Sequence, residues 1–262
     1  MRNLELEQLE TAWAGKTCLC FDSMESTQNY GKELGKKEPV HGTLILAEEQ
    51  TAGRGRRGRS WQSEKGANIA MSLCLEPKLR TEHAAGLTLV MALAVAEGIK
   101  KVTGREPQIK WPNDIVLNGR KICGILTEMC FKDGGYIVVI GVGINVNNTG
   151  FPEDIKGTAS SLKLETGAEI SREALIASVM ECFENYYEIY EQTEDLALLK
   201  EQYESMLANK NREVNVLDPK EPYKGTAMGI NSAGNLIVVC EDGTEKEVYS
   251  GEVSVRGIYG YV

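Results

Sequence analysis

The most constraining feature of this sequence is the nine-residue segment 53–61, which reads Gly-Arg-Gly-Arg-Arg-Gly-Arg-Ser-Trp. It gathers four arginines and three glycines in a chain that is otherwise acidic, with 29 Lys+Arg against 38 Asp+Glu. Glycines at this density stabilise neither a helix nor a strand, and neighbouring guanidinium groups repel one another unless an anion lies among them. The segment therefore predicts a mobile loop that closes on an anion, with the Ser60 hydroxyl suited to a phosphate and the Trp61 ring to an aromatic base.

The charge balance and the lack of export or membrane segments limit what the chain binds. A net charge of −9 argues against a general nucleic-acid binder, whose affinity comes largely from neutralising phosphates, so we expect no DNA partner. No apolar run reaches the roughly 18 residues that a membrane span needs. The segment Met1–Glu5 also lacks the apolar core of a signal peptide. We therefore expect a cytoplasmic protein with no membrane partner.

The cysteines and histidines give no sign of a metal site. The seven cysteines are odd in number, lie mostly within apolar runs and lack Cys-x-x-Cys or Cys/His ligand spacing. His41 and His83 are far apart in the sequence and have no partner at a ligand spacing. We predict reduced, buried thiols and surface histidines.

The periodicity of apolar residues predicts an α+β fold. A period of about two predicts strands and a period of 3.6 predicts helices. Strands are expected at 17–21, 43–47, 68–75, 122–128 and 136–146, and helices at 6–13, 84–102, 171–190 and 196–207. After Asn211 the pattern changes to short strands separated by turn residues, which indicates a small all-β barrel. The expected domains are 1–208 and 209–262.

One expected hairpin brings together residues of opposite charge. Trp111-Pro112-Asn113-Asp114 interrupts a strand, because proline removes a ladder donor and fixes φ. Asn118-Gly119 then predicts a two-residue hairpin turn. This geometry places Asp114 and Lys121 on neighbouring strands. Further along, glycines in Gly141-Val142-Gly143 allow close approach to the backbone, and Asn145 is expected to face a ligand.

Two familiar nucleotide-binding motifs do not apply. Segment 53–58 formally matches the dinucleotide fingerprint G-x-G-x-x-G, but that motif requires a helix opening on the glycines, and no apolar helical pattern follows. No G-x-x-x-x-G-K-[ST] occurs, so a P-loop NTPase is also unsupported. A disordered arginine–glycine RNA-binding segment fits poorly, because the loop lies between two strands and has no aromatic repeat.

Six motifs taken together resemble the biotin protein ligase family in order and spacing, and the resemblance covers nearly the whole chain. They are Ser26-Thr27-Gln28-Asn29, the segment Gln50–Trp61, Gly66-Ala67-Asn68, Lys110-Trp111-Pro112-Asn113-Asp114, the segment Arg120–Leu126 and Gly143-Ile144-Asn145. The resemblance implies a mixed-sheet catalytic domain of the biotin/lipoate ligase type, with helices packed on it and a C-terminal SH3-like barrel.

The resemblance also implies a two-step reaction. Biotin and ATP, with Mg²⁺, first give biotinyl-5′-adenylate and pyrophosphate. The biotinyl group then passes to a lysine of the carrier domain of a biotin-dependent carboxylase. No tightly bound redox cofactor is expected. The physical requirements agree, since two anions meet in the first step and a reactive mixed anhydride must be kept from water.

Site residues carry over by position within these motifs. The resemblance implies biotin binding by Ser26, Thr27, Gln28, Gln50, Arg54, Gly55, Arg56, Lys121 and Gly124. It implies nucleotide binding by Arg56, Arg59, Trp61, Asn113, Asp114 and Asn145, with Asp114 as a Mg²⁺ ligand, and catalytic roles for Lys121, Arg54 and Arg56. Trp111, in contrast, is expected to pack in the core.

The sequence departs from the family pattern in two places. The family commonly reads Ser-Thr-Asn where this chain has Ser26-Thr27-Gln28, with Asn29 one place later. Many bacterial relatives carry an N-terminal DNA-binding domain, and the Ser-Thr turn comes too early here to leave room for one, so we expect a ligase without repressor activity. Lipoate ligation and a nucleic-acid-binding regulator are the alternatives, and both a monomer and a homodimer stay open.

Overall fold

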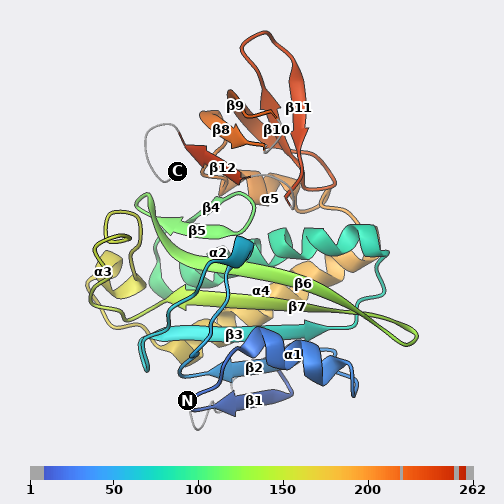
Figure 1. Cartoon of the computed structure of the whole chain (residues 1–262), viewed down its shortest axis with the longest axis vertical. Coiled ribbons are helices and arrows are strands. Elements are labelled where there is room, and N and C mark those ends of the chain that lie inside the picture. The colour runs from blue at the N-terminus through green and yellow to red at the C-terminus, as the bar shows by residue number, and fades with distance from the viewer. Residues whose placement is uncertain (1–8, 219–220, 251–253, 258–262) are drawn as a thin grey trace.

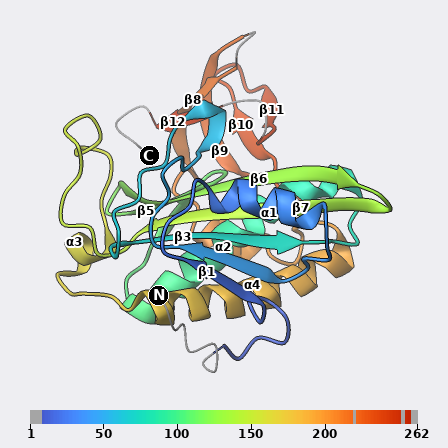
Figure 2. The ribbon, with the colours of Figure 1, turned by 60° about the horizontal axis from the view of Figure 1, so that its bottom comes forward.

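The computed structural model describes residues 9–218, 221–250 and 254–257, in which two sheets form the framework (Figures 1 and 2). The larger sheet has seven strands in the order β1-β2-β3-β7-β6-β5-β4. Its strands are β1 (Cys18–Phe21), β2 (Thr43–Ala47), β3 (Asn68–Leu75), β4 (Gln108–Lys110), β5 (Asp114–Leu117), β6 (Arg120–Lys132) and β7 (Gly135–Asn145). Only β1 and β2 pair in parallel, so the sheet is mixed, as predicted.

The smaller sheet has the order β11-β10-β9-β8-β12 and is antiparallel throughout. Its strands are β8 (Arg212–Leu217), β9 (Tyr223–Ile230), β10 (Leu236–Val239), β11 (Glu245–Val248) and β12 (Ser254–Gly257). Figure 1 shows this unit stacked on the β4–β5 end of the larger sheet. The predicted α+β class and the C-terminal β-rich unit are therefore confirmed.

Helices cover both faces of the larger sheet. The long helices α2 (Leu87–Thr103) and α4 (Arg172–Thr193) pack together on one face, and α1 (Thr27–Gly35) lies on the other (Figure 2). Strand β2 shows the two layers: Leu44 and Leu46 enter the large core with α2 and α4, whereas Ile45 enters a small cluster on the α1 side. The short helices are α3 (Leu162–Thr166), α5 (Lys200–Ser205) and the 3₁₀ segments η2 (Arg56–Gly58) and η3 (Thr81–Gly86).

The predicted β-turn chemistry is present at both ends of β5. Strands β4 and β5 are joined by Trp111-Pro112-Asn113. Asn118 and Gly119 have φ of 50° and 75°, the left-handed conformation that a two-residue hairpin requires. Trp111 is 2% exposed and its Nε1 donates to the Gly234 carbonyl at 3.0 Å. The expected core position of Trp111 is confirmed, and its hydrogen bond ties the C-terminal unit to the sheet.

Two expected helices differ from the prediction. The first is the helix expected at 6–13, of which 6–8 lie outside the described residues and 9–13 form no helix. The Glu184 carboxylate accepts hydrogen bonds from the backbone N–H groups of Ala12, Trp13 and Ala14 at 2.6–2.8 Å, which holds this segment in a turn. The helix expected at 196–207 is limited to α5, Lys200–Ser205. Across the described ranges, no helix is long and apolar enough to cross a membrane.

Candidate active site

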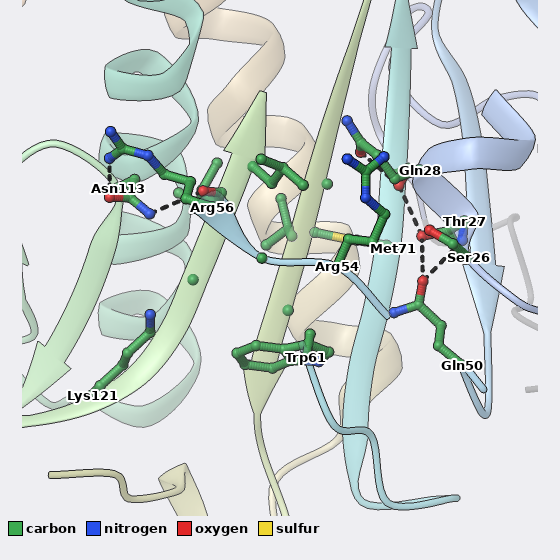
Figure 3. A pocket seen from close by; sticks show the side chains of 18 residues that line it. Ser26, Thr27, Gln28, Gln50, Arg54, Arg56, Trp61, Met71, Asn113 and Lys121 are labelled. Carbon is green, nitrogen blue, oxygen red and sulfur yellow. Dashed lines mark hydrogen bonds between the residues drawn. The ribbon is translucent and has the colours of Figure 1, made fainter. Parts of the chain in front are cut away.

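A cavity lies beneath the arginine-rich segment 53–61, which we call the arginine loop (Figure 3). Its walls come from the start of α1, the loop and strands β3, β6 and β7. They comprise Ser26, Thr27, Gln28, Gln50, Arg54, Gly55, Arg56, Trp61, Met71, Ser72, Asn113, Lys121, Gly124, Ile125, Leu126, Gly141, Val142 and Gly143. All nine residues predicted to bind biotin therefore lie in one place. We call this space the first cavity.

One end of the first cavity is polar and neutral. Thr27 donates to the Gln50 Oε1 atom from both its N–H and its hydroxyl, at 2.9 and 3.2 Å. The Ser72 hydroxyl donates in turn to Thr27 Oγ1 at 2.8 Å. Because the Gln50 Oε1 atom accepts these two bonds, the side-chain amide nitrogen of Gln50 points toward the cavity, as Figure 3 shows. Ser26 Oγ caps α1 by accepting from the Asn29 N–H at 3.4 Å, so its own proton remains available to a ligand.

Gln28 closes the wall at this polar end. It is 3% exposed, its Nε2 donates to the Val139 carbonyl at 2.9 Å, and its Oε1 accepts from the Ser72 hydroxyl at 3.3 Å. A Cβ placed on Gly141 would lie 2.6 Å from Gln28 Oε1, so any larger residue there would force the Gln28 amide to move. Gly141 therefore makes room for a side chain one methylene longer than the Asn of the family pattern. Ser72 was missed from the sequence, although a single hydroxyl in an apolar strand is a detectable signal.

The opposite end of the first cavity is charged. Lys121 Nζ lies 2.6 Å from Asp114 Oδ1, across the hairpin between β5 and β6. The predicted proximity of these two residues is confirmed. A Cβ on Gly124 would lie 3.1 Å from Lys121 Nζ, so this glycine leaves space beside the amine.

Arg56 places a second cation at the charged end. Its guanidinium donates to Asn113 Oδ1 at 2.6 Å and to the backbone carbonyl of Ser250, in the C-terminal unit. Burial lowers the pKa of Arg56, and nearby Asp114 partly offsets this effect. Asn113 Oδ1 and the Ser250 carbonyl are neutral acceptors, so this partly buried positive charge has capacity for an anion. No sequence pattern pointed to Ser250.

A second cavity lies on the other side of Trp61. Among its lining residues are Arg59, Trp61, Glu64, Asn68, Lys121, Asn145, Asn148, Phe151, Thr158 and Ala159. Three residues predicted to bind nucleotide, Arg59, Trp61 and Asn145, therefore come together here, and Trp61 and Lys121 line both cavities. Asn113 lines only the first of these two cavities, and Asp114 lines neither.

Trp61 packs directly on the backbone of β7. A Cβ on Gly143 would lie 2.4 Å from Trp61 Cε2, closer than real contacts allow, so the ring requires glycine there. Asn145 is held at the edge of the second cavity, accepting from Asn68 Nδ2 at 3.0 Å and donating to the Ser160 carbonyl at 3.1 Å. The segment around Ser160 also pairs with the backbone of Lys121. Asn68, Asn148 and the 158–160 segment were not predicted as site residues.

The Arg54 side chain does not point to the charged end of the first cavity, where its predicted catalytic role would place it. Its guanidinium donates to Asn29 Oδ1 at 2.9 Å and lies 3.4 Å from Glu128 Oε1. In Figure 3 Arg54 extends toward Gln28, away from Lys121, whereas Arg56 extends toward Asn113. The structure therefore does not support direct contact of Arg54 with the charged end of the cavity.

The described part of the chain offers no ready metal site. It contains no cluster of three or more His, Cys, Asp or Glu side chains that could hold a metal ion. Asp114, the predicted Mg²⁺ ligand, has one carboxylate oxygen occupied by Lys121. This contact orients Lys121, and the role of Asp114 as a Mg²⁺ ligand stays a prediction.

Comparison with known proteins decides the family. Residues 20–145 match the model of the biotin/lipoate A/B protein ligase family, and residues 211–256 match the biotin protein ligase C-terminal domain. The bifunctional ligase/repressor BirA of Bacillus subtilis is 37% identical over 250 residues, covering 94% of this chain and 76% of BirA. The chain belongs to the biotin protein ligase family.

Other similar proteins agree with this assignment. A biotin–[acetyl-CoA-carboxylase] ligase of Paracoccus denitrificans is 44% identical over 42% of this chain and 45% of its own length. The structure of the Aquifex aeolicus biotin protein ligase in complex with biotin and ATP has a TM-score of 0.82 and 30% identity, covering 92% of this chain and 99% of that one. The predicted family fold of a biotin protein ligase, with its SH3-like C-terminal unit, is confirmed.

Proposed function

We propose that the chain is an ATP-dependent biotin protein ligase, which forms biotinyl-5′-adenylate and then biotinylates a lysine of a carrier domain. The observation that carries the proposal is the meeting of two cavities at Lys121 and Trp61, with Arg56 closing the first of them. Such an arrangement lets a carboxylate from one cavity meet a phosphate from the other. The family and the relatives favour biotin over lipoate.

The first cavity suits biotin with its bicyclic head at the polar end. The ureido oxygen is an acceptor, and the Ser26 hydroxyl and the Gln50 amide supply donors there. The apolar side chains of Met71, Val142 and Leu126 line the wall beside the valeryl chain. The carboxylate then reaches the charged end, where Lys121 and Arg56 supply positive charge.

Adenylation joins two anions, and this is the barrier that the site must lower. A carboxylate oxygen of biotin attacks the α-phosphorus of ATP, a carbon–oxygen–phosphorus linkage forms, and the bond to pyrophosphate breaks. Lys121 and Arg56 neutralise the negative charge that gathers at the α-phosphate, in a site where water is partly excluded. In the second step an uncharged lysine amine attacks the acyl carbon, AMP leaves, and an amide remains. The closed arginine loop keeps water from the mixed anhydride in the meantime.

Several finer points form part of the proposal. ATP enters with Mg²⁺, but no step of our mechanism passes through the metal, because Asp114 is engaged with Lys121.

The two matched ranges and the start of β8 at Arg212 support the division into domains 1–208 and 209–262. The carrier is proposed to be that of a biotin-dependent carboxylase. The cytoplasmic location and the lack of DNA binding stay predictions.

Mass spectrometry of a purified biotin carrier domain tests the function directly. The carrier is incubated with the protein and Mg·ATP, with biotin in one sample and lipoate in another. A mass gain with biotin alone supports the proposal. A gain with lipoate alone would mean that the fold and chemistry are right but the acid is wrong. No gain in either sample would reject ligation and return attention to the nucleic-acid alternative.

Substitution of Gly143 by Ala tests the role of Trp61 at the second cavity. The added Cβ would lie 2.4 Å from the indole, so the ring must move. We expect ATP binding, measured by calorimetry, to weaken about tenfold, because stacking of a base on an aromatic side chain contributes about 1–3 kcal/mol. Gly157→Ala is the control, since a Cβ there meets no atom within 4 Å. Equal ATP affinity in both variants would remove the stacking role.

A further inference from the structure

Arg54 connects the arginine loop to the body of the sheet domain. Backbone hydrogen bonds from Gly55 N–H to the Arg59 carbonyl, at 2.7 Å, and from Trp61 N–H to the Gly53 carbonyl, at 2.9 Å, hold the loop in a hairpin-like shape. These bonds give the loop its own form but do not attach it to the sheet. The Arg54 side chain provides an attachment by crossing from the loop to α1 and β6.

Three residues outside the loop complete the contacts of Arg54: Asn29 and Glu128 bind it directly, and Lys32 binds Glu128. Asn29 and Lys32 are three positions apart and so lie on the same face of α1. Glu128 lies opposite them on β6, with Oε1 3.4 Å from Arg54 Nη2 and Oε2 3.1 Å from Lys32 Nζ. One carboxylate thus contacts two cations, one in the arginine loop and one in α1. We call Arg54, Asn29, Lys32 and Glu128 the loop latch.

The shared carboxylate lowers the cost of releasing Arg54 from Glu128. If Arg54 leaves, Glu128 keeps its contact with Lys32, so no partly buried carboxylate is left unpaired. The Arg54 side chain is 44% exposed, against 17% for Lys32, so the Arg54–Glu128 contact is the more strongly screened of the two. An exposed ion pair shifts an equilibrium by up to about fivefold. The latch therefore biases the loop toward closure without locking it.

We propose that Glu128 and Lys32 are positioning residues that set how long the arginine loop stays closed over the bound intermediate. Glu128 holds Arg54 in the closed loop, and Lys32 competes for the same carboxylate and receives it when the loop opens. The inference rests on the proposed function and gives Arg54 a task that its position fits. It also gives a role to Asn29, which follows the altered Ser-Thr-Gln motif and accepts a hydrogen bond from Arg54.

Two variants that break the same ion pair should act in opposite directions. Glu128→Gln and Lys32→Met both remove the Lys32–Glu128 contact, so a purely structural role of that pair would affect both alike. If the loop latch controls closure of the arginine loop, Glu128→Gln frees Arg54 and speeds release of preformed biotinyl-5′-adenylate by up to about fivefold at low salt. Lys32→Met leaves the carboxylate to Arg54 alone and slows release. Both differences should shrink near 1 M salt, where the Debye length is about 3 Å.

Trypsin cleavage of the free protein within the arginine loop gives a second readout that does not depend on ligase activity. Faster cleavage in Glu128→Gln and slower cleavage in Lys32→Met would support the latch even if the wild-type chain formed no adenylate, in which case only the proposed function would fail. Cleavage and release that change in the same direction in both variants, or that do not respond to salt, would overturn the latch.

Discussion

Replacing Lys121 by Met should lower the rate of adenylate formation by about 10²–10³-fold, the usual cost of removing one preorganised group that stabilises developing charge. Lys121 lies at the junction of the two cavities and carries a positive charge to the point where carboxylate and α-phosphate meet. Methionine keeps the length of the side chain and removes the charge. Pre-steady-state measurement of pyrophosphate release gives the rate of this step directly.

Asp114→Asn provides the matched control for Lys121. Both variants remove the ion pair between Lys121 and Asp114, whose atoms lie 2.6 Å apart, but only Lys121→Met removes the cation. Asparagine at 114 retains an oxygen that accepts a hydrogen bond from the amine, so we expect adenylate formation to fall by no more than about tenfold. An equal loss in the two variants would mean that the ion pair as such, rather than the charge of Lys121 at the reacting atoms, determines the rate.

The four arginines of the loop have separate surroundings in the structure. Arg54 contacts α1 and β6, Arg56 contacts Asn113 and the C-terminal unit, and Arg59 lines the second cavity. Arg57 has φ 58° and is exposed. Spreading the charges in different directions reduces the mutual repulsion that the sequence implied. The loop therefore needs an anion beside Arg56 more than beside Arg54.

Features that depend on neighbours in the sequence could be predicted well. The Asn118-Gly119 turn determines the β5–β6 hairpin, and the hairpin determines that Asp114 and Lys121 meet. The periodicity of 84–102 similarly predicts α2, with only its first turn replaced by the 3₁₀ segment η3. Local backbone preferences and one short-range pairing are sufficient for these results.

Features that depend on distant partners could not be predicted. The turn at residues 12–14 exists because Glu184, about 170 positions later, accepts its N–H groups. Arg56 bonds to Ser250, 194 positions away, and Arg54 to Glu128 on β6. Nothing in local composition distinguishes Glu128 from the other acidic residues of the chain. The motifs predict which residues line the site. The direction in which each arginine side chain points depends on the packed sheet and could not be predicted.

Replacing Arg56 by Gly should leave the fold intact and let the activated intermediate escape. Arg56 is half-buried and lies outside the hydrophobic core, so its removal leaves no core cavity, although it breaks hydrogen bonds to Asn113 and to the Ser250 carbonyl. A charge-assisted hydrogen bond to an anion contributes about 1.5–3 kcal/mol, so we expect biotin and adenylate to be retained about 10–100-fold less tightly. Released biotinyl-5′-adenylate would then react with lysines of bystander proteins, which a biotin blot detects.

Arg57→Gly is the control that separates the position of Arg56 from the charge of the loop. It removes one arginine from the same loop, and glycine adopts the left-handed conformation of residue 57 without steric cost. If the contact of Arg56 with the charged end of the cavity retains the intermediate, Arg57→Gly should release adenylate at nearly the wild-type rate. If net charge in the loop were what matters, both variants would leak alike. Tight retention in both would instead show that the intermediate is held by Lys121 and the cavity walls, and that the loop is no lid.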